Sequence, residues 1–171
     1  MLRQPWSNPN PAEPANWAAS AVPGGLPSGV APQQSYAAWR ALYWDTASAT
    51  NNSLSGPSAD PDGDGVCNFL EYAFGLDPHN ASARPQPVAS IESINGDMRL
   101  TLAFRMAPGA QDASLTWEVS SDLRNWSAPP NVFQLLSTEP CLDGTETVKY
   151  MDTTLLTSSA SRFVRLRITG L

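Results

Sequence analysis

Side chains that carry oxygen recur at alternate positions in residues 60–71, which read DPDGDGVCNFLE. In a tightly coiled loop, alternate residues each direct one oxygen toward a common centre, and Gly65 permits the sharp turn that this requires. A ligand set made only of oxygens favours Ca²⁺ over Zn²⁺, and the number of ligands favours Ca²⁺ over the smaller Mg²⁺. We therefore expect a calcium site in this loop. Its predicted ligands are the side chains of Asp60, Asp62, Asp64, Asn68 and Glu71 and the backbone carbonyl of Val66.

A solvated turn is the alternative interpretation of an Asp- and Gly-rich loop. Residues 59–84 contain five acidic residues and one Arg, so they carry a net charge of −4 out of −6 for the whole chain. Carboxylates crowded into one loop repel one another unless a cation neutralises them, which favours the metal site. The sequence has no second loop of this kind and its four methionines are scattered. We therefore expect an ion that stabilises the fold and not a regulatory switch.

Two helices are predicted to hold this loop. Ser35 is a suitable N-cap, and apolar residues recur from Tyr36 at the three-to-four spacing of an amphipathic helix of about three turns. Residues 50–59, TNNSLSGPSA, are typical of turns and loops. The second helix is predicted over residues 68–74, where Gly75 can end it in a left-handed conformation.

The last 85 or so residues have the alternation of β-branched, aromatic and polar residues that predicts β-strands. The predicted strands are Val88–Ile94, Met98–Met106, Ser114–Ser120, Val132–Leu136, Thr145–Met151 and Arg162–Thr169. Turn-forming residues separate them, as in an antiparallel sandwich. The expected fold is thus α+β, with a Pro-rich arm over residues 1–34, a helix–loop–helix calcium-binding module over 35–84 and an antiparallel β-sandwich over 85–171.

The N-terminal arm, residues 1–34, holds seven of the sixteen prolines. Proline fixes φ and removes a hydrogen-bond donor, so the arm is expected to be extended. Trp6 and Trp17 are unusual in a solvated linker because of their large apolar rings. Two interpretations remain open: a plain linker, or an arm whose tryptophans contact the body of the protein or a neighbouring subunit.

The segment DPDGDGVCNFLEYAFGLDP, residues 60–78, resembles a module found near the C-terminal ends of large secreted proteins of Verrucomicrobia- and Planctomycetes-type bacteria. The segments LTWEVSSDLRNW (115–126) and RFVRLRITGL (162–171) resemble strands of the β-module that follows it there. The loop also resembles those of EF-hands, dockerins and thrombospondin type 3 repeats, although dockerins carry two loops and this chain has one, ending in Glu71. The resemblance implies export and a non-catalytic tail or interaction role.

Cys67 and Cys141 are the two cysteines, so the chain has one candidate disulfide. A bridge between them would join the calcium-binding module to the β-sandwich. The alternative is that Cys67 is a small buried apolar residue.

Trp117, Trp126 and Tyr150 offer a candidate aromatic platform for sugar rings, which would make the chain a carbohydrate-binding module. The alternative places Trp117 in the core and Trp126 at one end of the sandwich. A hydrolase is a third and weaker interpretation, because the chain has one His and no G-x-S-x-G motif.

Composition excludes several further classes. The acidic balance, 10 Lys+Arg against 16 Asp+Glu, disfavours nucleic acid and anionic membranes as partners. No apolar run approaches the length of about 20 residues that crosses a bilayer. We expect a secreted or cell-surface protein, stabilised by Ca²⁺ and not catalytic, with a structural or adhesive role. Its partners would be other protein subunits or copies of itself, with an extracellular glycan as the alternative.

Overall fold

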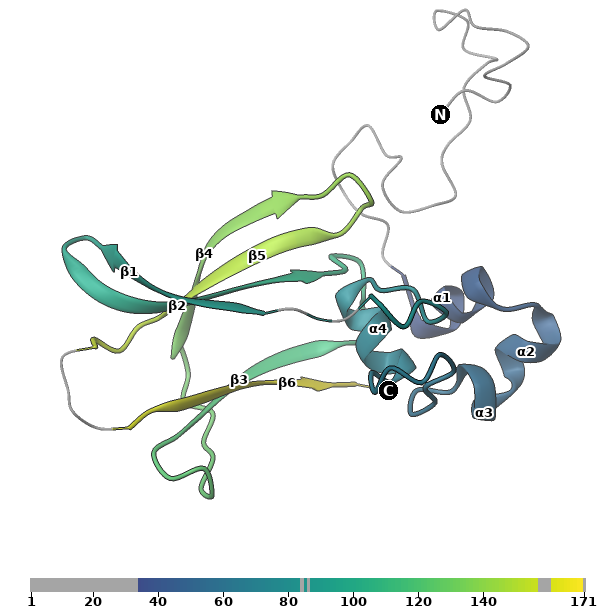
Figure 1. The fold of residues 1–171 in the computed structure, drawn as a ribbon, viewed down its shortest axis with the longest axis horizontal. Helices are drawn as coiled ribbons and strands as arrows, with labels where there is room; N and C mark the ends of the chain where they lie inside the picture. The colour runs from purple at the N-terminus through teal and green to yellow at the C-terminus, as the bar shows by residue number, and fades with distance from the viewer. Residues whose placement is uncertain (1–33, 84, 86, 157–160, 171) are drawn as a thin grey trace, which may run out of the picture.

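The computed structural model describes residues 34–83, 85, 87–156 and 161–170, and consists of short helices beside two antiparallel β-sheets. Figure 1 shows the helices gathered at one end of the molecule and the sheets extending away from them. The expected arm, with Trp6 and Trp17, lies outside the described residues except for Gln34. No helix in the described part of the chain is long and apolar enough to cross a bilayer.

The first helix, α1 (Tyr36–Tyr43), begins where the sequence predicts. Ser35 caps it, because its hydroxyl accepts a hydrogen bond from the Ala38 N–H at 3.1 Å. The helix ends one turn earlier than expected, at Trp44, whose backbone is extended.

Two short helices occupy the region expected to be helix end and loop, α2 (Thr46–Thr50) and α3 (Asn52–Ser55). Asp45 caps α2 and Asn51 caps α3, each through a side-chain oxygen that accepts a backbone N–H. These caps explain the correction to the prediction: Asp, Asn and Ser favour turns, but they also begin helices.

The helix after the acidic loop, α4 (Asn68–Phe74), is confirmed at both ends. Gly75 ends it with φ of 69°, the left-handed conformation expected of a terminal glycine. Tyr72 of α4 packs edge-on against Tyr36 of α1, with ring centroids 5.4 Å apart, and Trp39 completes this buried aromatic cluster. The cluster therefore joins the helix after the loop to α1.

Six strands form the two sheets, all paired antiparallel. They are β1 (Val88–Ile94), β2 (Asp97–Met106), β3 (Ser114–Ser120), β4 (Phe133–Pro140), β5 (Glu146–Asp152) and β6 (Phe163–Thr169). One sheet has the order β1-β2-β5-β4 and the other is the pair β3-β6. The expected α+β class and antiparallel sheets are confirmed. The observed strands coincide closely with the predicted ones except at β4, which begins one residue later than predicted and ends four residues later.

Trp117 of β3 packs between the sheets. Its ring stacks on Phe133 of β4 at 4.3 Å and meets Tyr150 of β5 edge-on at 5.3 Å. Phe104 of β2 approaches it at 6.0 Å. The rings of both sheets thus form one apolar layer.

Polar contacts fix the helices onto the sheets. The Tyr72 hydroxyl donates to the Gln34 carbonyl and accepts the Asp112 N–H, while the Ala107 N–H donates to the Ala73 carbonyl at 3.0 Å. Phe74, at the end of α4, packs edge-on against Phe104. The position of α4 is therefore tied to the β-sheets.

Candidate metal centre

The acidic loop is organised around the carboxylate of Asp60. This group accepts the backbone N–H groups of Gly63 at 2.9 Å, Asp64 at 3.2 Å and Gly65 at 2.9 Å. Gly63 and Gly65 have φ of 74° and 91°, values that side chains disfavour. The sharp turn expected at Gly65 is therefore present, and a second left-handed glycine precedes it.

This turn gathers three carboxylates. Asp60, Asp62 and Asp64 each offer one oxygen, and these oxygens lie within 4.8 Å of one another. The cluster can hold a metal ion, and its oxygen donors are compatible with Ca²⁺. Carboxylates this close repel one another in the absence of a cation.

Asn68 and Glu71 come from α4, and both are fully buried, with 0% of each residue exposed. Neither oxygen of the Glu71 carboxylate has a hydrogen-bond partner within the described residues. The Asn68 Oδ1 atom has none either, while its Nδ2 donates to the Leu54 and Gly56 carbonyls at 2.9 and 3.0 Å. Buried polar atoms of a folded protein are normally paired, so these oxygens lack the partner that a cation would provide.

The raised pKa of Glu71 also indicates that a cation would stabilise this site. The pKa of this carboxyl group is raised from an ordinary 4.5 to about 8, first by burial and then by the negative charges of Asp62, Asp64 and Asp60. The three Asp carboxylates of the loop therefore act on the Glu71 carboxyl group of α4 through their charge. A divalent cation would reverse the sign of this field.

Only some of the six predicted ligands have oxygens close to one another in the described structure. The group that lies within 4.8 Å contains the three Asp residues and not Glu71. Asn68 and Glu71 are placed by α4, and their unpaired oxygens meet the chemical requirement of ligands. The Val66 N–H donates to Asp64 at 2.7 Å, and ligation by its carbonyl stays a prediction.

Two contacts that support the loop are not evident from the sequence. The Asn68 N–H donates to the Ala59 carbonyl at 2.8 Å, and the Phe69 N–H donates to the Pro57 carbonyl at 3.0 Å. They bind the entrance of the loop to the start of α4. Backbone groups carry no residue-specific signal, so only the fold reveals them.

Ser55 connects the loop's entrance to α1. It is fully buried, its hydroxyl accepts the Arg40 guanidinium at 2.9 Å, and its carbonyl accepts the Tyr36 hydroxyl at 3.0 Å. The sequence offers no signal for this role beyond the helical spacing of Tyr36 and Arg40. The aromatic cluster and the acidic loop thus share a hydrogen-bonded frame.

The candidate disulfide is not formed in the structure, where both cysteines are free. Cys67 is the residue before α4, whereas Cys141 follows β4 and its Sγ lies 3.5 Å from the Thr147 hydroxyl. The two thiols thus belong to different surroundings. The structure therefore does not contain the candidate bridge between the helices and the sheets. Hydrogen bonds and aromatic packing hold them together instead.

The two tryptophans of the candidate sugar platform lie on different sides of the β3–β6 sheet. Trp117 points toward the other sheet, as described above. The Arg165 side chain lies on the opposite side of the β3–β6 sheet, where it donates a hydrogen bond to Glu118. Its guanidinium lies 4.1 Å from the centre of the Trp126 ring. Trp126 is half-buried beneath this cation.

No model of a protein family and no curated sequence matches this chain. The site's chemistry therefore rests on the geometry of its own residues.

Proposed function

We propose that this chain is a calcium-stabilised, non-catalytic structural or adhesive protein that works outside the cell, secreted or at the cell surface. The observation that carries the proposal is the Glu71 carboxylate, which is fully buried beside three Asp side chains with neither oxygen hydrogen-bonded. Burying such a charge without a partner is unfavourable, whereas Ca²⁺ accepts six to eight oxygens at 2.3–2.6 Å. Asp60, Asp62, Asp64, Asn68 and Glu71, with the Val66 carbonyl, would hold the ion.

Binding at this site would be coupled to folding. Glu71 and Tyr72 are adjacent in α4, so the residue that would close the calcium shell is covalently linked to the centre of the aromatic cluster. The unfolded chain has no preformed site, so calcium would stabilise α4 and the packing of α1 against it. A free calcium concentration of about 100 times Kd would contribute about 2.7 kcal/mol.

An extracellular setting supplies the calcium concentration that a single loop of moderate affinity needs. The structural role also agrees with the charged groups elsewhere. Glu92 is engaged by Lys149 at 2.7 Å and Glu118 by Arg165 at 2.6 Å, so these carboxylates are held in ion pairs. Protein subunits, including copies of this chain, are the partners that this role implies.

Thermal unfolding with and without a calcium chelator tests the proposal. Calcium should raise the Tm of the wild type by about 5–10 °C, the shift expected for about 2.7 kcal/mol in a chain of this size. The variant carrying Asp62→Ala and Glu71→Gln should show no calcium effect. Glu139→Gln, at an exposed position of β4, is the matched control and should respond like the wild type. Equal Tm values of the wild type in chelator and in millimolar calcium would refute the proposal.

A further inference from the structure

The two sheets differ in width, and this leaves part of one apolar face uncovered. Leu102 of β2 faces β3–β6, and the pairing of β1 with β2 puts Ile91 and Met98 on the same face. These two side chains belong to residues that are 63% and 50% exposed. A two-stranded sheet covers the four-stranded one only in part, so the inner face of β1 has no cover among the described residues.

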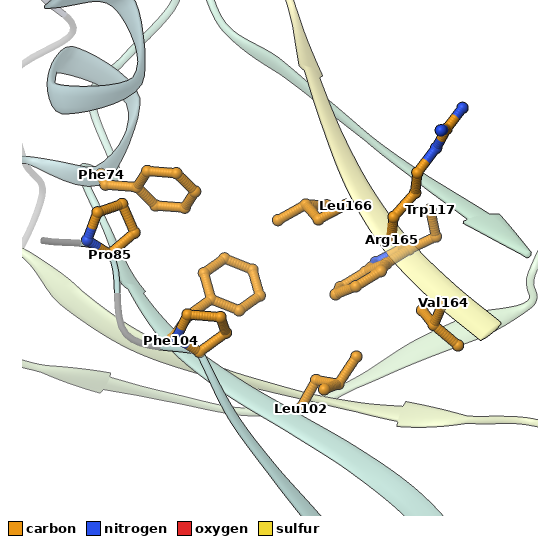
Figure 2. Close-up of a pocket in the computed structure, with 9 residues that line it drawn as sticks. Phe74, Pro85, Leu102, Phe104, Trp117, Val164, Arg165 and Leu166 are labelled. Atoms are coloured by element: carbon orange, nitrogen blue, oxygen red, sulfur yellow. The ribbon is translucent and has the colours of Figure 1, made fainter. Parts of the chain in front are cut away.

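A cavity of about 310 Å³ lies between β2 and β6, and the segment before β1 lines it through Pro85 and Pro87. Figure 2 shows Leu166 and Trp117 of one sheet and Leu102 and Phe104 of the other pointing toward the same space. The side chain of Phe74 closes the end nearest the helices. The cavity is thus an apolar groove beside β6.

β6 itself has an unpaired edge on this side. It pairs with β3 alone, over all seven of its residues, so its second edge has no strand beside it in the described structure. The edge strand β4, by contrast, carries a bulge between Leu135 and Ser137 and ends in Pro140, features that discourage further pairing. A strand added to β1 would widen the four-stranded sheet, which already extends beyond the two-stranded sheet that covers it. A strand added to β6 would continue a hydrogen-bonded ladder and cover the apolar face at once.

Residues 15–22 of this chain, ANWAASAV, are long enough to form that strand. Prolines occur at seven places in residues 1–33, and this is the one run between them that exceeds four residues. Proline cannot donate to a ladder, so no other part of this segment can pair over the five or six residues of an average strand. The run has no charge, and Trp17 is its large apolar side chain.

The connection to the body of the protein is long enough for the same chain to supply the strand. Residues 23–33 separate the run from Gln34, and eleven residues span up to about 40 Å when extended. Gln34 accepts a hydrogen bond from Tyr72, two residues before Phe74 of the groove. A tethered segment that can reach has an effective concentration in the millimolar range, which favours it over a second copy.

We propose that residues 15–22 add to the free edge of β6 of their own chain as a further strand, with Trp17 seated in the groove. The inference concerns the β-sheets and does not depend on the metal bound by the acidic loop.

Hydrogen–deuterium exchange of the full chain, read by mass spectrometry, tests this proposal. Amides of residues 15–22 should exchange at least about tenfold more slowly in the wild type than in Ala19→Pro, which interrupts the strand. Ala12→Pro makes the same substitution outside the run and should leave their exchange unchanged. Ile91→Glu, on the uncovered inner face, should speed their exchange, whereas Val88→Glu, at a 60% exposed position on the opposite face of β1, should not.

The molar mass from light scattering identifies the source of the strand. The proposal predicts the same molar mass for the wild type and for Ala19→Pro, with slow exchange that does not depend on protein concentration. Exchange of residues 15–22 in the wild type as fast as in Ala19→Pro would overturn it. A larger assembly that Ala19→Pro dissolves would overturn the assignment to the same chain, because a second copy would then supply the strand.

Discussion

The substitution Glu71→Gln should change stability in opposite directions with and without calcium. The pKa of Glu71 is raised from 4.5 to about 8 in the folded, metal-free protein, mainly by burial. At pH 7 the unfolded chain has released this proton and the folded chain retains it, which costs about 3 kcal/mol of stability by the linkage relation. Gln has nearly the same shape and no charge, so the variant should recover up to about that amount in chelator.

The pH dependence follows from the same shift. Below the unfolded pKa of 4.5 both states of Glu71 are protonated and the destabilisation is absent; it grows as pH rises through 4.5 and reaches its limit near pH 8. The advantage of Glu71→Gln in chelator should therefore be small at pH 4.5 and large at pH 7.5. In saturating calcium the order reverses, because the variant loses a ligand of the ion.

Urea unfolding followed by tryptophan fluorescence measures both effects, at two pH values, in chelator and in calcium. Trp39 lies in the cluster formed with Tyr72 and reports on α4. Glu139→Gln serves as the control for loss of one acidic charge at an exposed position. If Glu71→Gln lowers the free energy of unfolding in chelator as much as in calcium, the buried Glu71 carboxyl group does not carry the cost that its raised pKa implies, and the reasoning fails.

Three further substitutions test the frame around the site, each by urea or thermal unfolding in calcium. Gly75→Ala should cost about 1–3 kcal/mol, because φ is 69° there and the added Cβ would lie 2.6 Å from the Thr145 methyl group. Trp117→Ala should cost about 3–5 kcal/mol, since its ring fills the layer between the sheets. Asp152→Asn should cost about 3 kcal/mol, because the carboxylate is 1% exposed and holds the Arg162 guanidinium with both oxygens.

Leu142→Ala, at a fully exposed position, is the control for these three and should change stability by less than about 0.5 kcal/mol. A Trp117→Ala variant as stable as this control would contradict the placement of Trp117 between the sheets. Similar stability of Gly75→Ala would contradict the left-handed end of α4.

The strands and the second helix could be predicted from sequence because local signals there agree with the fold. Alternation of apolar and polar residues marks β1 to β6, and Gly75 marks the end of α4. The region between residues 44 and 55 could not be predicted in this way. There Asp45 and Asn51 act as helix caps, whereas the same residue types are equally common in turns.

The spacing of the acidic loop predicts which carboxylates come together, because alternate positions of a short loop share one centre. Asp60, Asp62 and Asp64 do so in the structure. The burial of Glu71 and the anchoring of Asn68 to Leu54 and Gly56 depend on how α4 packs on the rest of the chain. Such packing is a tertiary property that residue spacing does not encode.

The width of the two sheets is the second feature beyond the reach of local patterns. Alternation predicts that Met98 and Leu102 of one strand share a face, but not that β3 and β6 form a sheet of only two strands. The uncovered face of β1, and hence the groove beside β6, follows from that pairing.

Calorimetric titration of the chelator-treated full chain with Ca²⁺ tests the central claim most directly. The account predicts one ion bound per chain in the wild type, and no binding at the same concentrations by the variant carrying Asp62→Ala and Glu71→Gln. It also predicts unchanged binding by Glu139→Gln. Absence of binding by the wild type at millimolar Ca²⁺, or equal binding by the double variant, would contradict the assignment of the acidic loop as a calcium site.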